Sequence, residues 1–169
     1  MKKWLLTSLI IAILLIGSGF AAHKLLKHPS PFSTQIRNQS QFLIFYPDPR
    51  ATGYKVDVST IQYDTSAKVL SFTAQGSGNS LTITEQTTPD PFNDIPQYWD
   101  AFTTKLQNYA SFDSVNGQIA LTQPVELKGG QSAVMNSKGT LMFVHPTGSG
   151  LSEDQWKQVF NNLESTQPL

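Results

Sequence analysis

The sequence predicts an α+β fold, with an N-terminal transmembrane helix followed by a mostly antiparallel sheet packed with two amphipathic helices. Residues 4–22 carry no charged side chain. Later segments alternate apolar and polar residues in short runs separated by turn dipeptides such as Asn116-Gly117, which is the pattern of antiparallel strands. Two other segments repeat apolar residues every three or four positions, as amphipathic helices do. Groups of consecutive strands separated by helices are typical of the α+β class.

Residues 1–28 form the expected signal-anchor, a transmembrane segment with basic residues on both flanks. A helix over residues 4–22 is about 28 Å long, close to the hydrocarbon thickness of a bilayer. A cleaved signal peptide is the alternative, because Gly19 and Ala21 are small residues with the spacing of a cleavage site. A short N-terminal tail before a large domain predicts a single-pass protein of the cell membrane. Its N-terminus is then cytoplasmic and its C-terminal domain extracytoplasmic.

The rest of the chain divides into a flexible linker at 29–41 and an extracytoplasmic α+β domain at 42–169. The linker segment is rich in Pro, Ser, Asn and Gln and has little apolar periodicity. All 12 acidic residues but only eight of the 12 Lys and Arg residues follow residue 28, so the part after the anchor has a net charge of −4. A mildly acidic domain is unsuited to binding nucleic acid. The chain has no Cys, which excludes disulfides, thiolate nucleophiles and Cys-ligated metals.

Strands are predicted in the first part of the domain. An apolar run at 42–46 ends at Pro47, and the segment 54–58 alternates apolar and polar residues after a Thr-Gly pair. The runs 69–74 and 81–85 each place their apolar residues on one face, and a Gly-rich turn separates them. These two runs therefore predict a β-hairpin.

An amphipathic helix is predicted next, with Asp94 as its N-cap and Pro96 in its first turn. Its apolar residues are Ile95, Trp99, Phe102, Leu106 and Tyr109.

Turn dipeptides then delimit four strands of a meander. These strands are expected at 112–115, 118–127, 131–136 and 140–145. Residues 141–144 are apolar on both alternating faces, so this strand is expected to be central and covered on both sides. A final helix is predicted from the capping box of Ser152 and Gln155. Its apolar stripe consists of Trp156, Val159, Phe160 and Leu163.

Three side chains are candidates for a ligand surface: Trp99, Trp156 and His145. The two tryptophans lie on apolar helix stripes, where packing in the core is the usual role of Trp and an aromatic floor for a ligand is the alternative. His145 is the residue around which a hydrolase site would have to be built, with Ser132 and Ser149 as nominal partners, and we expect a structural role for it. No catalytic, cofactor-binding or metal-ligating residues are assigned, because the sequence has no nucleophile elbow, phosphate loop or metal-ligand spacing.

Several short motifs carry a resemblance to a known group of proteins. They are Phe45-Tyr46-Pro47, Gly53-Tyr54, the segment 81–86 followed by Pro89, Asn116-Gly117 and the closing helix at 156–163. Together they resemble uncharacterised single-pass bacterial membrane proteins with an extracytoplasmic α+β domain of the DUF4367-like type. The resemblance implies an architecture and a topology. It implies no catalytic residues, because the family has no established activity.

The function expected from these features is non-enzymatic binding, sensing or envelope assembly by a membrane-anchored extracytoplasmic domain. The expected partners are the membrane, through residues 4–22, and another envelope protein, with no cofactor and no nucleic acid; the oligomeric state stays open. One alternative is an exported carrier-like domain that holds an apolar ligand under Trp99 and Trp156. The other is a hydrolase centred on His145.

Overall fold

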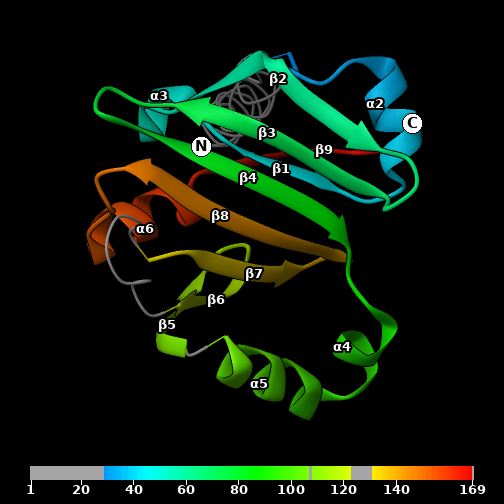
Figure 1. Ribbon diagram of the computed structural model, residues 1–169, viewed down its shortest axis with the longest axis vertical. Helices are drawn as coiled ribbons and strands as arrows, with labels where there is room; N and C mark the ends of the chain where they lie inside the picture. The colour runs from blue at the N-terminus through cyan, green and yellow to red at the C-terminus, as the bar shows by residue number, and fades with distance from the viewer. Residues whose placement is uncertain (1–28, 107, 123–130, 169) are drawn as a thin grey trace, which may run out of the picture. The chain divides into compact units, whose positions relative to one another are not determined.

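A seven-stranded antiparallel sheet with a two-stranded sheet across one of its faces forms the centre of the fold (Figure 1). The computed structural model describes residues 29–106, 108–122 and 131–168. The chain separates into two compact units, Met1–Ser30 and Pro31–Leu169, and every helix and strand of the described residues belongs to the second. The large sheet has the strand order β2-β3-β4-β8-β7-β6-β5, and β1 pairs antiparallel with β9. This arrangement confirms the predicted α+β class and the mostly antiparallel sheet.

Nine strands and five helices make up the described part of the chain. The strands are β1 (Ile44–Pro47), β2 (Lys55–Asp64), β3 (Val69–Gln75), β4 (Asn79–Thr87), β5 (Asn108–Ser114), β6 (Gly117–Thr122), β7 (Ala133–Ser137), β8 (Thr140–Gly148) and β9 (Leu163–Thr166). The helices are α2 (Thr34–Ser40), α3 (Pro49–Thr52), α4 (Asp90–Asp94), α5 (Pro96–Lys105) and α6 (Glu153–Asn161). None of these helices has the length and apolar character needed to cross a membrane. The predicted span at 4–22 lies outside the described residues.

The predicted β3–β4 hairpin and the central position of β8 are both confirmed. In the hairpin, Phe72 pairs with Ile83 and Ala74 pairs with Leu81, and all four side chains are buried. Strand β8 is the fourth of the seven strands, between β4 and β7. The four strands predicted from turn dipeptides are present as β5 to β8. Strand β5 begins at Asn108, so the prediction that the middle helix extends to Tyr109 is wrong, and residues 123–127 of the second predicted strand lie outside the described residues.

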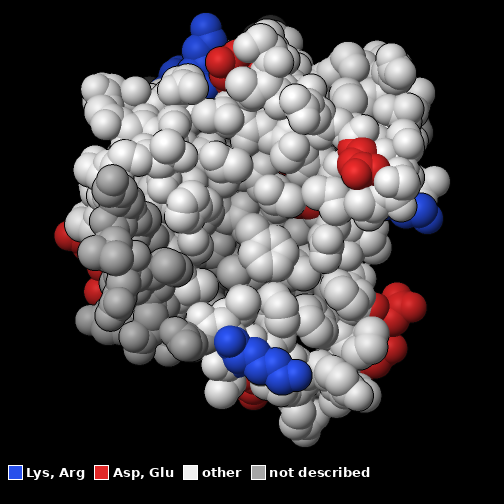
Figure 2. Space-filling view, in the orientation of Figure 1, with Lys and Arg blue, Asp and Glu red and all other residues white. Residues whose placement is uncertain are grey.

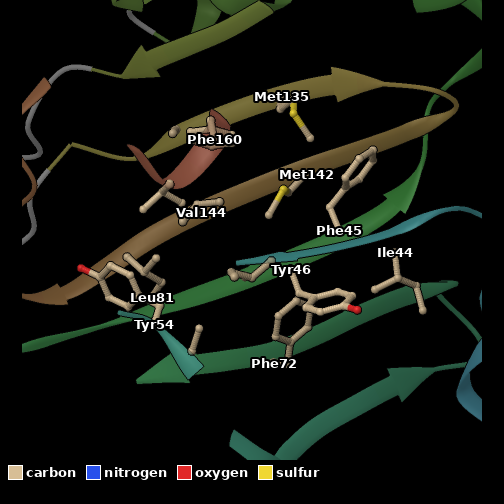
Figure 3. Close-up of a cluster of buried hydrophobic side chains, with 14 of the residues drawn as sticks. Ile44, Phe45, Tyr46, Tyr54, Phe72, Leu81, Met135, Met142, Val144 and Phe160 are labelled. Carbon is tan, nitrogen blue, oxygen red and sulfur yellow. The ribbon is translucent and has the colours of Figure 1, made fainter. Parts of the chain in front are cut away.

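The core fills the space between the large sheet, the β1–β9 pair and helix α6. Side chains from β1, β3, β4, β7, β8 and α6 gather there in one cluster (Figure 3). The Ser152–Gln155 capping box is present at the start of α6, as predicted, and Trp156, Val159 and Phe160 are buried. The helix ends at Asn161, so the prediction that it continues through Leu163 is wrong. Leu163 instead begins β9, which pairs with β1.

Two buried side chains of the large sheet hold β1 against it. Glu85 of β4 is fully buried, and its Oε1 accepts a hydrogen bond from the backbone N–H of Phe45 at 3.0 Å. Thr140 of β8 donates its hydroxyl hydrogen to the carbonyl of Leu43 at 2.6 Å. An unpaired backbone group in the core is costly, and these contacts satisfy one such group in β1 and one in Leu43 directly before it. Burial raises the pKa of Glu85 well above its usual value, and its Oε2 has no partner among the described residues.

The segment 29–41 is not the structureless linker that its composition predicts. Ser33 caps helix α2 through a hydrogen bond from the Ile36 N–H to its side chain. Phe32 is only 4% exposed and packs edge-on against Tyr46 and Phe72, with ring centroids 5.6 and 5.0 Å away. Burying a Phe side chain stabilises a fold by about 1.5–3 kcal/mol, enough to order its neighbours. A single apolar residue within a polar segment gives no periodicity, which is why the sequence pattern missed it.

The predicted N-cap of the middle helix is also wrong. The chain forms two short helices in this region, and Asp94 ends α4 instead of starting α5. Ile95 lies between them in an extended conformation, with φ −132° and ψ 97°. Because the ring of Pro96 disfavours a helical conformation in the preceding residue and itself suits a first helical position, the boundary falls at Ile95.

Candidate functional site

An open hollow of about 330 Å³ lies between the α4–α5 pair and the large sheet. Its lining comes from four elements. Phe92 belongs to α4, Trp99 and Asp100 to α5, Gln118 to β6 and Asn136 to β7. The volume is at the lower end of the range for small-molecule sites in proteins.

The hollow is on the opposite face of the sheet from the core. Ile119 and Met135 pair with each other and are fully buried in the core. Successive side chains of a strand point to opposite faces, so the adjacent Gln118 and Asn136 point away from the core and lie side by side. Strand alternation thus brings two amide side chains together under helix α5.

Each amide is hydrogen-bonded to a neighbouring side chain. Trp99 Nε1 lies 3.0 Å from Gln118 Oε1. An indole N–H is only a donor, so the Gln118 atom facing it must be the oxygen. The Thr88 hydroxyl donates to Asn136 Oδ1 at 2.6 Å. In both side chains the oxygen is engaged by the protein, which leaves the NH₂ group as the donor for a ligand.

A group of aromatic rings forms the apolar part of the site. The ring of Phe92 is 6.1 Å from that of Trp99 and 5.0 Å from that of Phe102. Phe102 in turn contacts Phe143 of β8 edge-on, at 6.2 Å between ring centroids. These contacts anchor α5 to the sheet and place the half-buried ring of Trp99 at the side of the hollow.

The site is nearly neutral. Asp100 is the one charged residue among its lining residues, and it is exposed. On the face drawn in Figure 2, charged side chains are scattered and form no large continuous patch of either sign. With one carboxylate and no cation in its lining, the hollow favours neutral or cationic groups over anionic ones.

The structure separates the three residues that the sequence singled out. Trp99 lines the hollow. Trp156 is fully buried on the core face, where its ring lies 6.0 Å from that of Phe160, and its Nε1 has no partner among the described residues. His145 is exposed on β8. The two tryptophans therefore do not share a surface on which one ligand would contact both.

His145 and Ser132 do come together. Ser132 Oγ lies 2.8 Å from His145 Nδ1, because residue 132 directly precedes β7 and pairing of Ala133 with Val144 puts the two side chains next to each other. In a serine triad a carboxylate orients the imidazole from its other nitrogen. Within the described residues, no carboxylate is hydrogen-bonded to His145. The pair is a Ser–His contact on an exposed sheet face, without the third group of a triad among the described residues.

A second, smaller hollow of about 140 Å³ lies between α3, the β3–β4 turn and α6. The Tyr54 hydroxyl donates to Asn79 Oδ1 at 2.7 Å beside it. Burial raises the pKa of Tyr54 above its ordinary value of 10.0, and the hydrogen bond to Asn79 offsets part of this. The lining is uncharged and consists of Thr52, Gly53, Tyr54, Gly76, Ser77, Asn79, Gln155, Gln158 and Val159.

Neither a metal cluster nor a known relative identifies the chemistry of the described residues. These residues contain no group of three or more His, Asp or Glu side chains placed to hold a metal ion. Comparison of the chain with protein-family models, curated proteins and solved structures found no match. The site must therefore be interpreted from its own geometry.

Four of the five lining residues of the hollow were missed at the level of sequence: Phe92, Asp100, Gln118 and Asn136. One signal was present, since Gln118 comes directly before the apolar run of β6 and Asn136 directly after that of β7, both at positions that alternate away from the core. That signal becomes useful only once the register of β6 against β7 is known.

Proposed function

We propose that this chain is a membrane-anchored, extracytoplasmic binding domain and that the hollow beside Trp99 is its ligand surface. The anchor is assigned to residues 4–22, whose uncharged stretch and basic flanks support it. The ligand surface is assigned from one observation: a hollow in which aromatic rings, two oriented amides and a carboxylate converge. Ligand sites characteristically combine an apolar wall with a few placed polar groups.

The groups in the hollow are suited to recognition. Aromatic rings supply contact area at little cost in side-chain entropy, and amides fix a ligand by directional hydrogen bonds. This set supports the proposed role in binding, sensing or envelope assembly. The resemblance to DUF4367-like domains supports the same placement at the outer side of a membrane.

Site-specific photo-crosslinking in the cells that produce the protein tests the ligand surface. A photoreactive residue replaces Asp113 of β5, which pairs with Gln118 next to the hollow. The matched control replaces Val58 of β2, which is 64% exposed at the other edge of the sheet. We expect a discrete adduct from position 113 and none of the same mass from position 58. Identical adducts, or none from position 113, would contradict the assignment.

Proteolysis of intact cells tests the topology. With the domain outside the cytoplasmic membrane, added protease degrades it once any outer barrier has been permeabilised, while a cytoplasmic marker stays intact. A domain that resists digestion until the cytoplasmic membrane is lysed would refute the extracytoplasmic placement.

Ester hydrolysis at Ser132 is a second candidate function, favoured by the 2.8 Å contact with His145 Nδ1. In this mechanism Ser132 Oγ attacks the ester carbonyl and its proton passes to Nδ1. The departing alkoxide takes that proton, and water then releases the acid from the acyl-serine. A fluorophosphonate probe should label the wild type and the Ser149→Ala control but neither Ser132→Ala nor His145→Gln. Equal labelling of all four proteins, or of none, would exclude this function.

A further inference from the structure

We propose that the ligand of the hollow beside Trp99 is a neutral sugar chain, bound through one ring that stacks on the aromatic wall. The inference rests on the proposed function and names the chemical class of its ligand. It follows from the kinds of groups that line the hollow and from the way the protein orients them.

The two amides act as donors. Because Trp99 Nε1 and the Thr88 hydroxyl engage the oxygens of Gln118 and Asn136, each side chain presents its NH₂ group to a ligand. Two neighbouring NH₂ groups match two neighbouring acceptor oxygens. Adjacent sugar hydroxyls, or a hydroxyl and the carbonyl of an acetamido group, provide such a pair.

Asp100 is the complementary acceptor. It lies on α5, one position after Trp99, and it is exposed at the hollow. A carboxylate accepts hydrogen bonds and does not donate them when ionised, so it suits the O–H or N–H donors of a sugar. Sugar hydroxyls both donate and accept, which lets one ring satisfy Asp100 and the amides together.

The aromatic wall and the lack of cationic side chains in the lining narrow the chemical class of the ligand further. The C–H face of a sugar ring is apolar and buries well against Trp99 and Phe92, which are both half-buried in the free protein. The single carboxylate disfavours phosphorylated or carboxylated ligands, which would also lack a positive partner in the lining. A neutral, hydroxyl-rich ligand with one apolar face fits these conditions.

Titration of the purified full chain in a mild detergent tests the inference. The probes are N,N′,N″-triacetylchitotriose and cellotriose, with heat release and tryptophan fluorescence as readouts. Glucose 6-phosphate is the anionic comparison. We expect saturable binding of at least one neutral trisaccharide and none of the phosphate. Replacing the carboxylate by Asp100→Asn should weaken binding about tenfold or more, because a hydrogen bond to a charged group contributes about 1.5–3 kcal/mol.

The control variant is Asp154→Asn, which makes the same charge change at an exposed position of α6, on the other face of the sheet and outside the lining. We expect its affinity to equal that of the wild type. Equal weakening by both variants would indicate a general charge effect and overturn the assignment to Asp100. No binding of either trisaccharide would overturn the sugar inference.

The cellular crosslink separates failure of the inference from failure of the proposed function. A protein or lipid adduct at position 113 without trisaccharide binding supports the assignment of the ligand surface and refutes the inference that its ligand is a sugar. A glycan adduct together with trisaccharide binding supports both. If there is no adduct and no trisaccharide binding, the proposed function and the sugar inference are both refuted.

Discussion

The buried Glu85 carboxyl makes stability depend on pH in a direction that the structure determines. Its pKa in the folded protein is well above the ordinary value of 4.5, because burial disfavours the charged form. The hydrogen bond from the Phe45 N–H lowers the pKa and offsets part of this effect. The folded protein therefore binds more protons than the unfolded chain at pH values between 4.5 and the raised pKa. The contribution of this group is fully present below pH 4.5 and is lost as the pH rises through the pKa of the folded protein.

The variant Glu85→Gln removes this dependence with little change of shape. The amide oxygen still accepts the Phe45 N–H, now bonded to Glu85 Oε1 at 3.0 Å. The NH₂ group takes the place of Oε2, which has no partner among the described residues, so the variant orphans no additional group of the protein. Below pH 4.5 the two proteins should differ in the free energy of unfolding by a constant.

Above pH 4.5 the difference should grow in favour of the variant. Each unit by which the pKa of Glu85 is raised corresponds to about 1.4 kcal/mol, so the wild type loses up to about 1.4 kcal/mol per pH unit relative to Glu85→Gln. The loss stops once the pH passes the raised pKa. All other titrating groups are common to both proteins and cancel in the difference.

Urea unfolding followed by tryptophan fluorescence measures this difference from about pH 4 to about pH 9, with the full chain in a mild detergent. Glu164→Gln on β9 is the matched control, since it removes a half-buried carboxylate close to the same pair of strands. A difference between wild type and Glu85→Gln that stays flat with pH would refute the reasoning. The reasoning would also be refuted if Glu164→Gln showed the same pH-dependent gain in the free energy of unfolding over the wild type.

Three further substitutions should change the free energy of unfolding, measured by urea denaturation at fixed pH. Phe32→Ala should cost about 3–5 kcal/mol because it empties a site between two core rings, whereas a linker position would be neutral. Gly76→Ala should cost about 1–3 kcal/mol because its Cβ would lie 2.7 Å from Tyr54 Cε1. The control Gly78→Ala should cost less, because a Cβ at that position has no atom within 4 Å. Equal losses in the two variants would count against the clash with Tyr54. Ser152→Ala should cost about 1 kcal/mol through loss of the capping box, and an unchanged midpoint would argue against the cap.

The elements that the sequence predicted are those whose signals are local. The β3–β4 hairpin, the β5–β8 meander and the capping box of Ser152 each depend on residues close together in the chain. Strand β9 was missed because Leu163 continues the helical spacing of Trp156 and Phe160. Only pairing with β1, whose residues lie far away in the sequence, makes it a strand.

The candidate site was predicted only in part, for the same reason. Trp99 was singled out, but Gln118 and Asn136 meet it only through the register of two strands and the docking of α5. His145 and Ser132 were named together without a geometric argument, and pairing of β7 with β8 places them in contact. Trp156 has the same helical context as Trp99 in the sequence, and only packing separates the buried ring from the accessible one.

The pairing of β1 with β9 imposes a waiting time on a chain that is still being made. Ile44 pairs with Thr166, so β1 stays without its partner until the intervening chain has been synthesised, about 6–24 s at ordinary rates of translation. All four residues of β1 are buried in the finished fold, so their exposure before β9 is synthesised favours aggregation. Pro47 ends this strand and Pro49 follows it, and both lack the N–H needed to extend a foreign sheet. The nascent chain thus carries its own protection against aggregation beside the strand that is completed late.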